Sequence, residues 1–223
     1  MAVKREDALE IILTTKIIAV IRMADPAKLR PVVEAIQRGG VMAIEITMTT
    51  PGALESIRDL AATKPAGILI GAGTVLDAGT AASVIRAGAD FVVSPVLDRE
   101  VIRVCREQDT FIAPGAFTPT EILAAWRLGA DVVKIFPATA AGPKFFKDIK
   151  GPFPHIRLMP TGGVDLENAA AFIAHGASCV AIGTALLDPI LIANDDWDGL
   201  TAKAGALARS LGRIHLGPNG RTE

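Results

Sequence analysis

Residues 128–135 read Leu-Gly-Ala-Asp-Val-Val-Lys-Ile, and a similar pattern occurs three more times along the chain. In each copy a glycine ends a helix in the left-handed conformation, a short turn follows, and an apolar strand begins. A helix-to-strand turn that recurs in one chain predicts alternating strands and helices, and therefore a parallel sheet. The other three copies are residues 38–45, 87–94 and 175–182.

Eight apolar runs are predicted as strands, and their starts lie roughly 20 to 26 residues apart, enough for one strand and one helix per unit. The segments between them show helical spacing of apolar residues. Helix starts are marked by a capping residue at Asp25, Thr50, Asp77, Asp98, Thr118 and Asp165. The predicted strands are 17–22, 42–48, 68–74, 91–95, 111–117, 132–138, 156–162 and 179–186.

Eight strand–helix units without a linker predict one (β/α)8 TIM barrel domain over residues 1–223. Residues 5–15 are predicted as an extra N-terminal helix at the bottom of the barrel, and residues from about 212 to 223 as a frayed tail. The alternative is a doubly wound open sheet, which usually has fewer strands. That fold favours a Gly-x-Gly-x-x-Gly turn after its first strand, and Ile21-Arg-Met-Ala-Asp-Pro contains none.

The composition agrees with a buried parallel sheet. Half of the 223 residues are hydrophobic and none is tyrosine, so Ala, Val, Ile and Leu must fill the core. A net charge of −1 gives no basic footprint for nucleic acid. No signal-peptide pattern and no apolar run of ~20 residues is present, which predicts a soluble cytoplasmic protein without membrane contact. Cys105 and Cys179 are expected to be buried free thiols rather than a disulfide.

Lys134 stands inside the apolar run Val132-Val-Lys-Ile-Phe-Pro. An unpaired ammonium in low dielectric is costly, so burial would favour the neutral amine. A neutral amine is a nucleophile towards carbonyl carbon, which makes Schiff-base chemistry the first hypothesis. The alternative is a lysine at a strand end that covers apolar surface with its stem and keeps its ammonium in water.

Polar residues collect at the predicted C-terminal ends of strands, where barrels carry their chemistry. Glu45 interrupts an apolar strand, and a buried carboxylate is costly unless it is paired. It is either a structural ion-pair partner of Lys134 or Arg22, or a general acid/base whose pKa is set by burial. Arg22 is either a rim ion pair or a bidentate ligand for a substrate carboxylate.

Two glycine turns, Thr161-Gly-Gly and Gly183-Thr, follow the seventh and eighth predicted strands. Such turns let backbone N–H groups approach an anion, and barrels often bind phosphate at this position. The alternative is that the glycines only permit tight turns. No Lys or Arg adjoins either turn, so binding would depend on backbone amides and hydroxyls. No His, Asp or Glu grouping has metal-ligand spacing, so no metal site is predicted.

Six segments share their order and spacing with one known family. On these segments, over about residues 5–190, the chain resembles the 2-keto-3-deoxy-6-phosphogluconate aldolases, which include bifunctional enzymes that also act on 4-hydroxy-2-oxoglutarate. The segments are Glu45-Ile-Thr-Met-Thr-Thr-Pro, Gly71-Ala-Gly-Thr-Val, Gly88-Ala-Asp-Phe-Val-Val-Ser-Pro, Pro114-Gly-Ala-Phe-Thr-Pro-Thr-Glu, Lys134-Ile-Phe-Pro-Ala and Pro160-Thr-Gly-Gly-Val.

The resemblance implies a class I aldolase on a (β/α)8 barrel, a homotrimer, with Lys134 as the Schiff-base lysine and Glu45 as the acid/base. Some members have arginine where this chain has Thr49, so the contact made from Thr49 is in doubt and Arg22 is the candidate to replace it. The remaining carried-over residues are Thr74, Pro95 and Phe136 in the pyruvate pocket, Thr161 at the keto acid, and Gly162, Gly163, Gly183 and Thr184 at the phosphate.

The predicted reaction is cleavage of 2-keto-3-deoxy-6-phosphogluconate to pyruvate and glyceraldehyde 3-phosphate, with 4-hydroxy-2-oxoglutarate, which yields pyruvate and glyoxylate, as a second candidate substrate. No cofactor is expected, because a lysine iminium is itself the electron sink. The alternatives are an aldolase for another 2-keto-3-deoxy sugar acid, a phosphate-binding barrel epimerase or isomerase, and a non-catalytic binding barrel.

Overall fold

The computed structural model describes residues 3–212 and has an α/β fold in which a helix follows most strands. All strand pairings are parallel, as the recurring helix-to-strand turn predicted. The strands are β1 (Ile17–Ile21), β2 (Ala43–Thr47), β3 (Leu69–Gly73), β4 (Phe91–Val93), β5 (Phe111–Ala113), β6 (Gly115–Ala116), β7 (Val133–Ile135), β8 (Leu158–Pro160) and β9 (Val180–Ile182).

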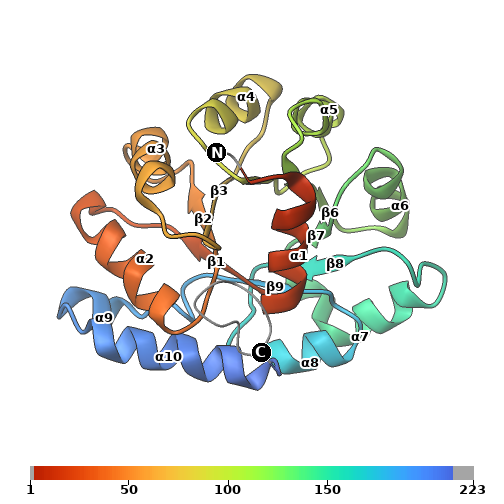
Figure 1. Ribbon diagram of the computed structural model, residues 1–223. Helices are drawn as coiled ribbons and strands as arrows, with labels where there is room; N and C mark the ends of the chain where they lie inside the picture. The colour runs from red at the N-terminus through yellow and green to blue at the C-terminus, as the bar shows by residue number, and fades with distance from the viewer. Residues whose placement is uncertain (1–2, 213–223) are drawn as a thin grey trace.

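The helices surround the strands, and α1 lies across the middle of the view in Figure 1. The extra N-terminal helix that was predicted for residues 5–15 is present with those bounds. The helices are α1 (Arg5–Thr15), the 3-10 helix η1 (Pro26–Lys28), α2 (Leu29–Arg38), α3 (Ala53–Thr63), α4 (Ala78–Arg86), α5 (Arg99–Glu107), α6 (Pro119–Arg127), α7 (Ala138–Lys150), α8 (Ala169–Ala174), α9 (Pro189–Ala193) and α10 (Trp197–Ser210).

The strands form two parallel sheets. A curled six-stranded sheet has the order β5-β4-β3-β2-β1-β9, and a three-stranded sheet has the order β6-β7-β8. Thr161, directly after β8, forms a parallel bridge with Ala181 in β9. At the opposite edges of the two sheets, β5 and β6 are separated along the chain by Pro114 alone.

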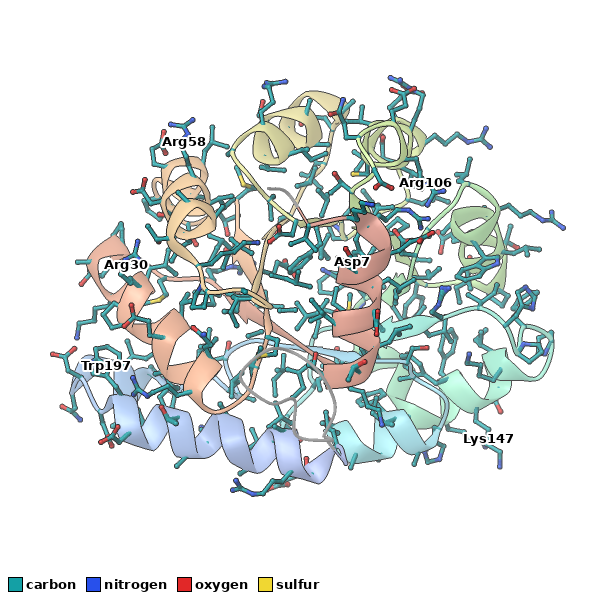
Figure 2. All side chains as sticks on the ribbon, in the orientation of Figure 1. Asp7, Arg30, Arg58, Arg106, Lys147 and Trp197 are labelled. Atoms are coloured by element: carbon teal, nitrogen blue, oxygen red, sulfur yellow. The ribbon has the colours of Figure 1, made fainter. Side chains whose placement is uncertain are left out.

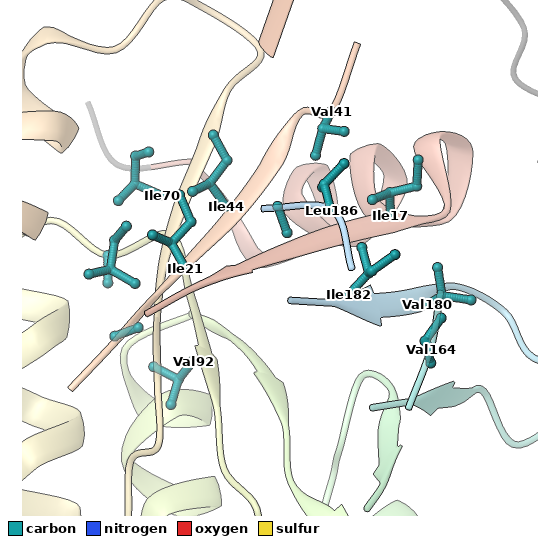
Figure 3. Close-up of a cluster of buried hydrophobic side chains, with 14 of the residues drawn as sticks. Ile17, Ile21, Val41, Ile44, Ile70, Val92, Val164, Val180, Ile182 and Leu186 are labelled. Atoms are coloured by element: carbon teal, nitrogen blue, oxygen red, sulfur yellow. The ribbon is translucent and has the colours of Figure 1, made fainter. Parts of the chain in front are cut away.

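Two hydrophobic clusters lie on opposite faces of the strands, and each strand contributes residues to one or both of them. The larger lies between the strands and the surrounding helices, and part of it is drawn in Figure 3. The smaller takes residues from strands of both sheets, mostly near their N-terminal ends, and includes Ala8 and Ile12 of α1. Helix α1 therefore covers the N-terminal side of this inner cluster, which leaves the C-terminal ends of the strands available for a site.

The recurring turn adopts the conformation that its sequence predicted. Gly40, Gly88, Gly129 and Gly176 have φ angles of 92°, 102°, 101° and 102°, a region that residues with a Cβ rarely adopt. The aspartates of the Gly-Ala-Asp copies add a second function. Asp131 donates its N–H to Ile112 O at 3.1 Å, and its Oδ2 accepts from Ile112 N at 2.9 Å. Asp90 makes the same pair of bonds with Ile70. These two aspartates therefore join their turns to an earlier strand, Asp131 to β5 and Asp90 to β3.

The Asp131 bonds lead to a stability prediction. Burial raises the pKa of Asp131, against the lowering effects of the Ile112 N–H and of Arg5, and the bond from Ile112 N to Oδ2 is the contact that an asparagine can keep. We expect Asp131→Ala to reduce the free energy of unfolding by about 2 kcal/mol, because Ile112 N–H loses its buried acceptor, and Asp131→Asn by less than about 1 kcal/mol. Urea unfolding measures both. Equal losses would show that the ion pair with Arg5 carries the stabilisation instead.

Several details of the strand and helix predictions were wrong. Most predicted strands are longer than the observed ones, and the run 132–138 overlaps the first residue of α7, Ala138. The run 111–117 is divided into β5 and β6, because Pro114 has no N–H to donate to a ladder. Thr50 does not cap a helix, and Asp165 caps the turn that leads into α8, by accepting from Glu167 N and Asn168 N, rather than α8 itself. Helix α3 begins at Ala53 after Gly52, and α8 begins at Ala169 after Asn168. The caps predicted at Asp25, Asp77, Asp98 and Thr118 are confirmed by side-chain hydrogen bonds to the following turn.

Charged side chains cover the outer faces of the helices, as Arg30, Arg58 and Lys147 illustrate in Figure 2. Cys105 and Cys179 are buried free thiols, as expected. None of the helices within residues 3–212 has the length and apolar character needed to cross a membrane. The frayed tail predicted for residues from about 212 to 223 lies almost entirely outside the described residues.

Candidate active site

Alternation along two strands brings Glu45 and Lys134 to the same interior. In β2, Ala43 belongs to the inner cluster, and Glu45 follows it on the same side two residues later. In the second sheet, Val132 belongs to the inner cluster and Lys134 follows it in the same way. One carboxylate and one amine, from different sheets, therefore occupy the layer next to the C-terminal ends of the strands.

The Glu45 side chain is 1% exposed, and its Oε2 has no hydrogen-bond partner among residues 3–212. Room for the carboxylate comes from Gly73, the last residue of β3, where a Cβ would overlap the Glu45 side chain. Burial raises the pKa of Glu45, and the positive charges of Lys134 and then Arg22 oppose this rise. A carboxyl with an unused oxygen and a raised pKa is suited to exchange protons with a bound molecule.

Lys134 is 6% exposed and pairs through its backbone with Gly115 in β6 and Met159 in β8. Burial lowers the pKa of Lys134; the charge of Glu45 raises it and that of Arg22 lowers it. Its Nζ lies 5.2 Å from the centroid of the Phe136 ring. The alternative reading of Lys134, with its ammonium in water, is contradicted by this burial, and the lowered pKa increases the share of neutral amine.

A cavity of about 830 Å³ opens at the C-terminal ends of β1, β8 and β9. Lys134 and Glu45 are not among its lining residues, but Phe136, whose ring lies beside the Lys134 amine, forms part of its wall. The cavity thus brings together most of the predicted binding residues next to the buried amine. Those that line it are Arg22, Phe136, Thr161, Gly162, Gly163, Gly183 and Thr184.

The polar groups of this cavity can bind an anion. Thr161 Oγ1 is buried and has no hydrogen-bond partner among residues 3–212, so it is free for a ligand. Gly162 and Gly163 have φ angles of 82° and 79°, which turn the backbone after β8 sharply before α8. Arg22 reaches the cavity from the end of β1 and is exposed. A guanidinium, a hydroxyl and two glycine turns together suit a ligand with more than one anionic group.

Three predicted binding residues lie outside the lining of this cavity. Thr49 is exposed, and its hydroxyl donates to Thr47 Oγ1 at 3.2 Å. Thr74 follows β3 with a φ of 45°, so it departs from the alternation of the strand. Pro95 is half-buried, and its carbonyl lies against Gly115. Their roles stay predictions.

Sequence reasoning missed Lys28, which lines the same cavity as the glycine turns. No cation adjoins those turns along the chain, but Arg22 and Lys28 share the cavity with them in space. Thr47 was placed with Glu45 at the end of this strand from sequence, but its buried contact with the hydroxyl of Thr50, 3.1 Å away, was missed. Within residues 3–212, no cluster of three or more His, Cys, Asp or Glu side chains is arranged to hold a metal ion.

Comparison with known proteins gives consistent results. The family model described as "KDPG and KHG aldolase" matches residues 9–203. The 2-dehydro-3-deoxy-phosphogluconate aldolase of Pseudomonas aeruginosa is 40% identical over 184 residues, which cover 82% of this chain and 83% of that protein.

Two solved structures are similar over most of the chain. A crystal structure of KDPG aldolase from Legionella pneumophila, with pyruvate captured as a covalent carbinolamine intermediate, has a TM-score of 0.83 and 30% identity and covers 89% of this chain and 97% of its own. A cube-shaped protein cage, designed by fusing symmetric oligomeric domains, has a TM-score of 0.80 and 30% identity and covers 87% of this chain and 71% of its own.

Proposed function

This chain belongs to the KDPG and KHG aldolase family of carbon–carbon lyases, and from that premise we propose that it is a class I aldolase acting through Lys134. It cleaves 2-keto-3-deoxy-6-phosphogluconate (KDPG) to pyruvate and glyceraldehyde 3-phosphate. The same chemistry converts 4-hydroxy-2-oxoglutarate (KHG) to pyruvate and glyoxylate. The observation that carries the proposal is the buried amine of Lys134, which shares one interior with the Glu45 carboxyl beside a cavity lined by Arg22, Thr161 and two glycine turns.

The first half of the reaction forms the iminium. The neutral Lys134 amine attacks the C2 ketone, and the ketone oxygen takes a proton to give a carbinolamine. Loss of that oxygen as water leaves the iminium. Glu45 supplies and removes the protons, directly or through a water, because its Oε2 has no partner among residues 3–212 and burial raises its pKa towards that of a working acid/base.

The second half breaks the carbon–carbon bond. When the C4 hydroxyl loses its proton, the C3–C4 electron pair moves through C3 to the iminium nitrogen, which gives an enamine and frees the aldehyde. The enamine takes a proton at C3, and hydrolysis of the iminium releases pyruvate and restores Lys134. The lysine is the electron sink in every step, so the proposed mechanism uses no cofactor.

The substrate has two anionic ends, and the binding residues fall into two groups. Arg22 and Thr161 bind the carboxylate, with Thr74, Pro95 and Phe136 around the pyruvate carbons. Thr49 can offer only an uncharged hydroxyl, so Arg22 is the residue that pairs with the negative charge of the carboxylate. Backbone amides of Gly162, Gly163, Gly183 and the hydroxyl of Thr184 bind the phosphate.

The two sheets are proposed to close into a single (β/α)8 barrel domain. Support comes from the bridge between Thr161 and Ala181 and from the single residue, Pro114, between β5 and β6. The inner cluster, which receives residues from both sheets, gives further support. A homotrimer is proposed from the family resemblance and from the likeness to a cage of oligomeric domains. Light scattering at micromolar concentration tests the trimer, and a monomeric mass would exclude it.

An aldol cleavage assay tests the function. The panel contains KDPG, its unphosphorylated counterpart, the C4 epimer of KDPG and KHG, and pyruvate release is followed with lactate dehydrogenase. We expect KDPG to give the highest kcat/KM, because the unphosphorylated acid and KHG cannot use the glycine turns and the relative at 40% identity is named for KDPG rather than for its epimer. Turnover of none of the four acids would reject the aldolase proposal, and preference for the epimer would change the substrate.

Arg22→Met is expected to raise KM for KDPG roughly 10- to 100-fold, because a bidentate, charge-assisted contact with the carboxylate is lost. The contact exists in both the ground state and the transition state, so kcat should change much less. Steady-state kinetics measures the separation of the two effects. Arg30→Met, at an exposed arginine on α2, is the control. An unchanged KM would make Arg22 a rim residue.

A further inference from the structure

Lys28 joins two walls of the cavity that are far apart in sequence. Its Nζ donates to the carbonyl oxygens of Ile192 at 2.8 Å and Ala193 at 3.2 Å, and lies 2.9 Å from Asp195 Oδ1. An ammonium has three donors, so all of them are used by these acceptors. We call this set of contacts the Lys28 bridge.

The Lys28 bridge holds a segment that has little stability of its own. Helix α9 has 5 residues, too few to be stable in isolation. Its last carbonyls have no partner within the helix, and that of Ile192 accepts from the N–H of Asp195 at 3.3 Å as well as from Lys28. A cation at this end also interacts favourably with the helix dipole. Its N-terminus is held separately, by Asp188, which accepts from Ile190 N and Lys203 Nζ. Lys28 therefore fixes the C-terminal end of α9 to the loop that carries Arg22.

We propose that Lys28 is a positioning residue for the phosphate end of the substrate. The bridge sets the width of the cavity between the loop after β1 and the chain that runs from Gly183–Thr184 into α9. Lys28 does not contact the phosphate, because its donors are used within the protein and Asp195 balances its charge. The inference deepens the proposed function and rests on it.

Lys28→Met removes the bridge while it keeps the length of the side chain. We expect KM for KDPG and the inhibition constant of glycerol 3-phosphate, a probe of the phosphate end, to rise about tenfold. The kcat for KDPG and the pyruvate concentration that half-saturates borohydride labelling of Lys134 should stay within about twofold, because neither depends on the phosphate end. Arg38→Met is the matched control, since Arg38, the last residue of α2, also contacts a C-terminal helix, through Asp198 and Thr201 in α10.

Asp195→Asn separates positioning from direct attraction. Asp195 is exposed and has a φ of 54°, which asparagine tolerates, so this variant keeps the fold even if Lys28→Met does not. A positioning role predicts a higher KM for KDPG, because the bridge is weakened. A direct phosphate contact predicts a lower KM, because the ammonium is freed, and that result would overturn the inference.

Borohydride labelling of Lys134 distinguishes failure of the proposed aldolase function from failure of the positioning role of Lys28. Unlabelled Lys134 in the wild-type protein would reject the proposed function, and the inference with it. Normal labelling with an unchanged KM for KDPG in Lys28→Met would reject the positioning role alone. An equal rise in the half-saturating pyruvate concentration would show a general disturbance of the site and would also reject it.

Discussion

Replacement of Lys134 by methionine is expected to abolish aldol cleavage, with a loss of kcat of at least about 10⁴-fold, because no other group can form the iminium. Methionine has a similar length and no charge, and Lys134 is buried, so the fold should persist. Burial lowers the pKa of Lys134 and so favours its neutral, nucleophilic form. The thioether of methionine cannot replace this amine. Steady-state cleavage of KDPG measures the loss.

Borohydride reduction in the presence of pyruvate identifies the same residue directly. One pyruvate-derived group should appear on the peptide that carries Lys134 and should be absent from the Lys134→Met protein. Lys147→Met is the matched control, because Lys147 is an exposed lysine on α7, the helix that follows β7. Labelling of Lys144 or Lys147 with an unmodified Lys134 would refute the mechanism.

Local sequence predicted the parts of the fold whose cause is local. The glycines at 88 and 129 end helices because their φ angles suit no other residue, and the strands after them follow directly. Glu45 and Lys134 were identified from sequence because burying a charge inside an apolar strand costs free energy unless the group is paired or functional. The Pro114 interruption was predictable from its missing N–H but was not used.

The missed features depend on contacts that no local pattern contains. Lys28 meets Ile192 and Ala193 across 164 and 165 positions of sequence. Thr50 has the right type for a helix cap, but its hydroxyl contacts Thr47 and the N–H of Met23 instead. In each case the tertiary partner decided the role of the side chain, and the sequence around the residue did not identify that partner.

Glu45→Gln is the second change with a large expected effect. We expect kcat to fall on the order of 10²-fold or more, because the amide cannot exchange the protons of the carbinolamine. Burial raises the pKa of Glu45, so the stability that this group contributes is lost as pH rises through the folded pKa. A neutral amide of the same size should therefore unfold in urea no earlier than the wild type at pH 7. Near-normal kcat would make Glu45 a structural partner of Lys134 only.

The same variant tests the electrostatics of the site through the direction in which the pKa of Lys134 shifts. The charge of Glu45 raises the pKa of Lys134, and that of Arg22 lowers it. Glu45→Gln should therefore extend pyruvate-dependent labelling of Lys134 to lower pH, whereas Arg22→Met should restrict it to higher pH, because labelling needs the neutral amine. Initial labelling rates across a pH series, each normalised to its own plateau, separate this shift from the slower chemistry of Glu45→Gln. The absence of a shift in both variants would mean that burial alone, without these two charges, sets the pKa of Lys134, and shifts of the same sign would contradict the opposite effects of the two charges.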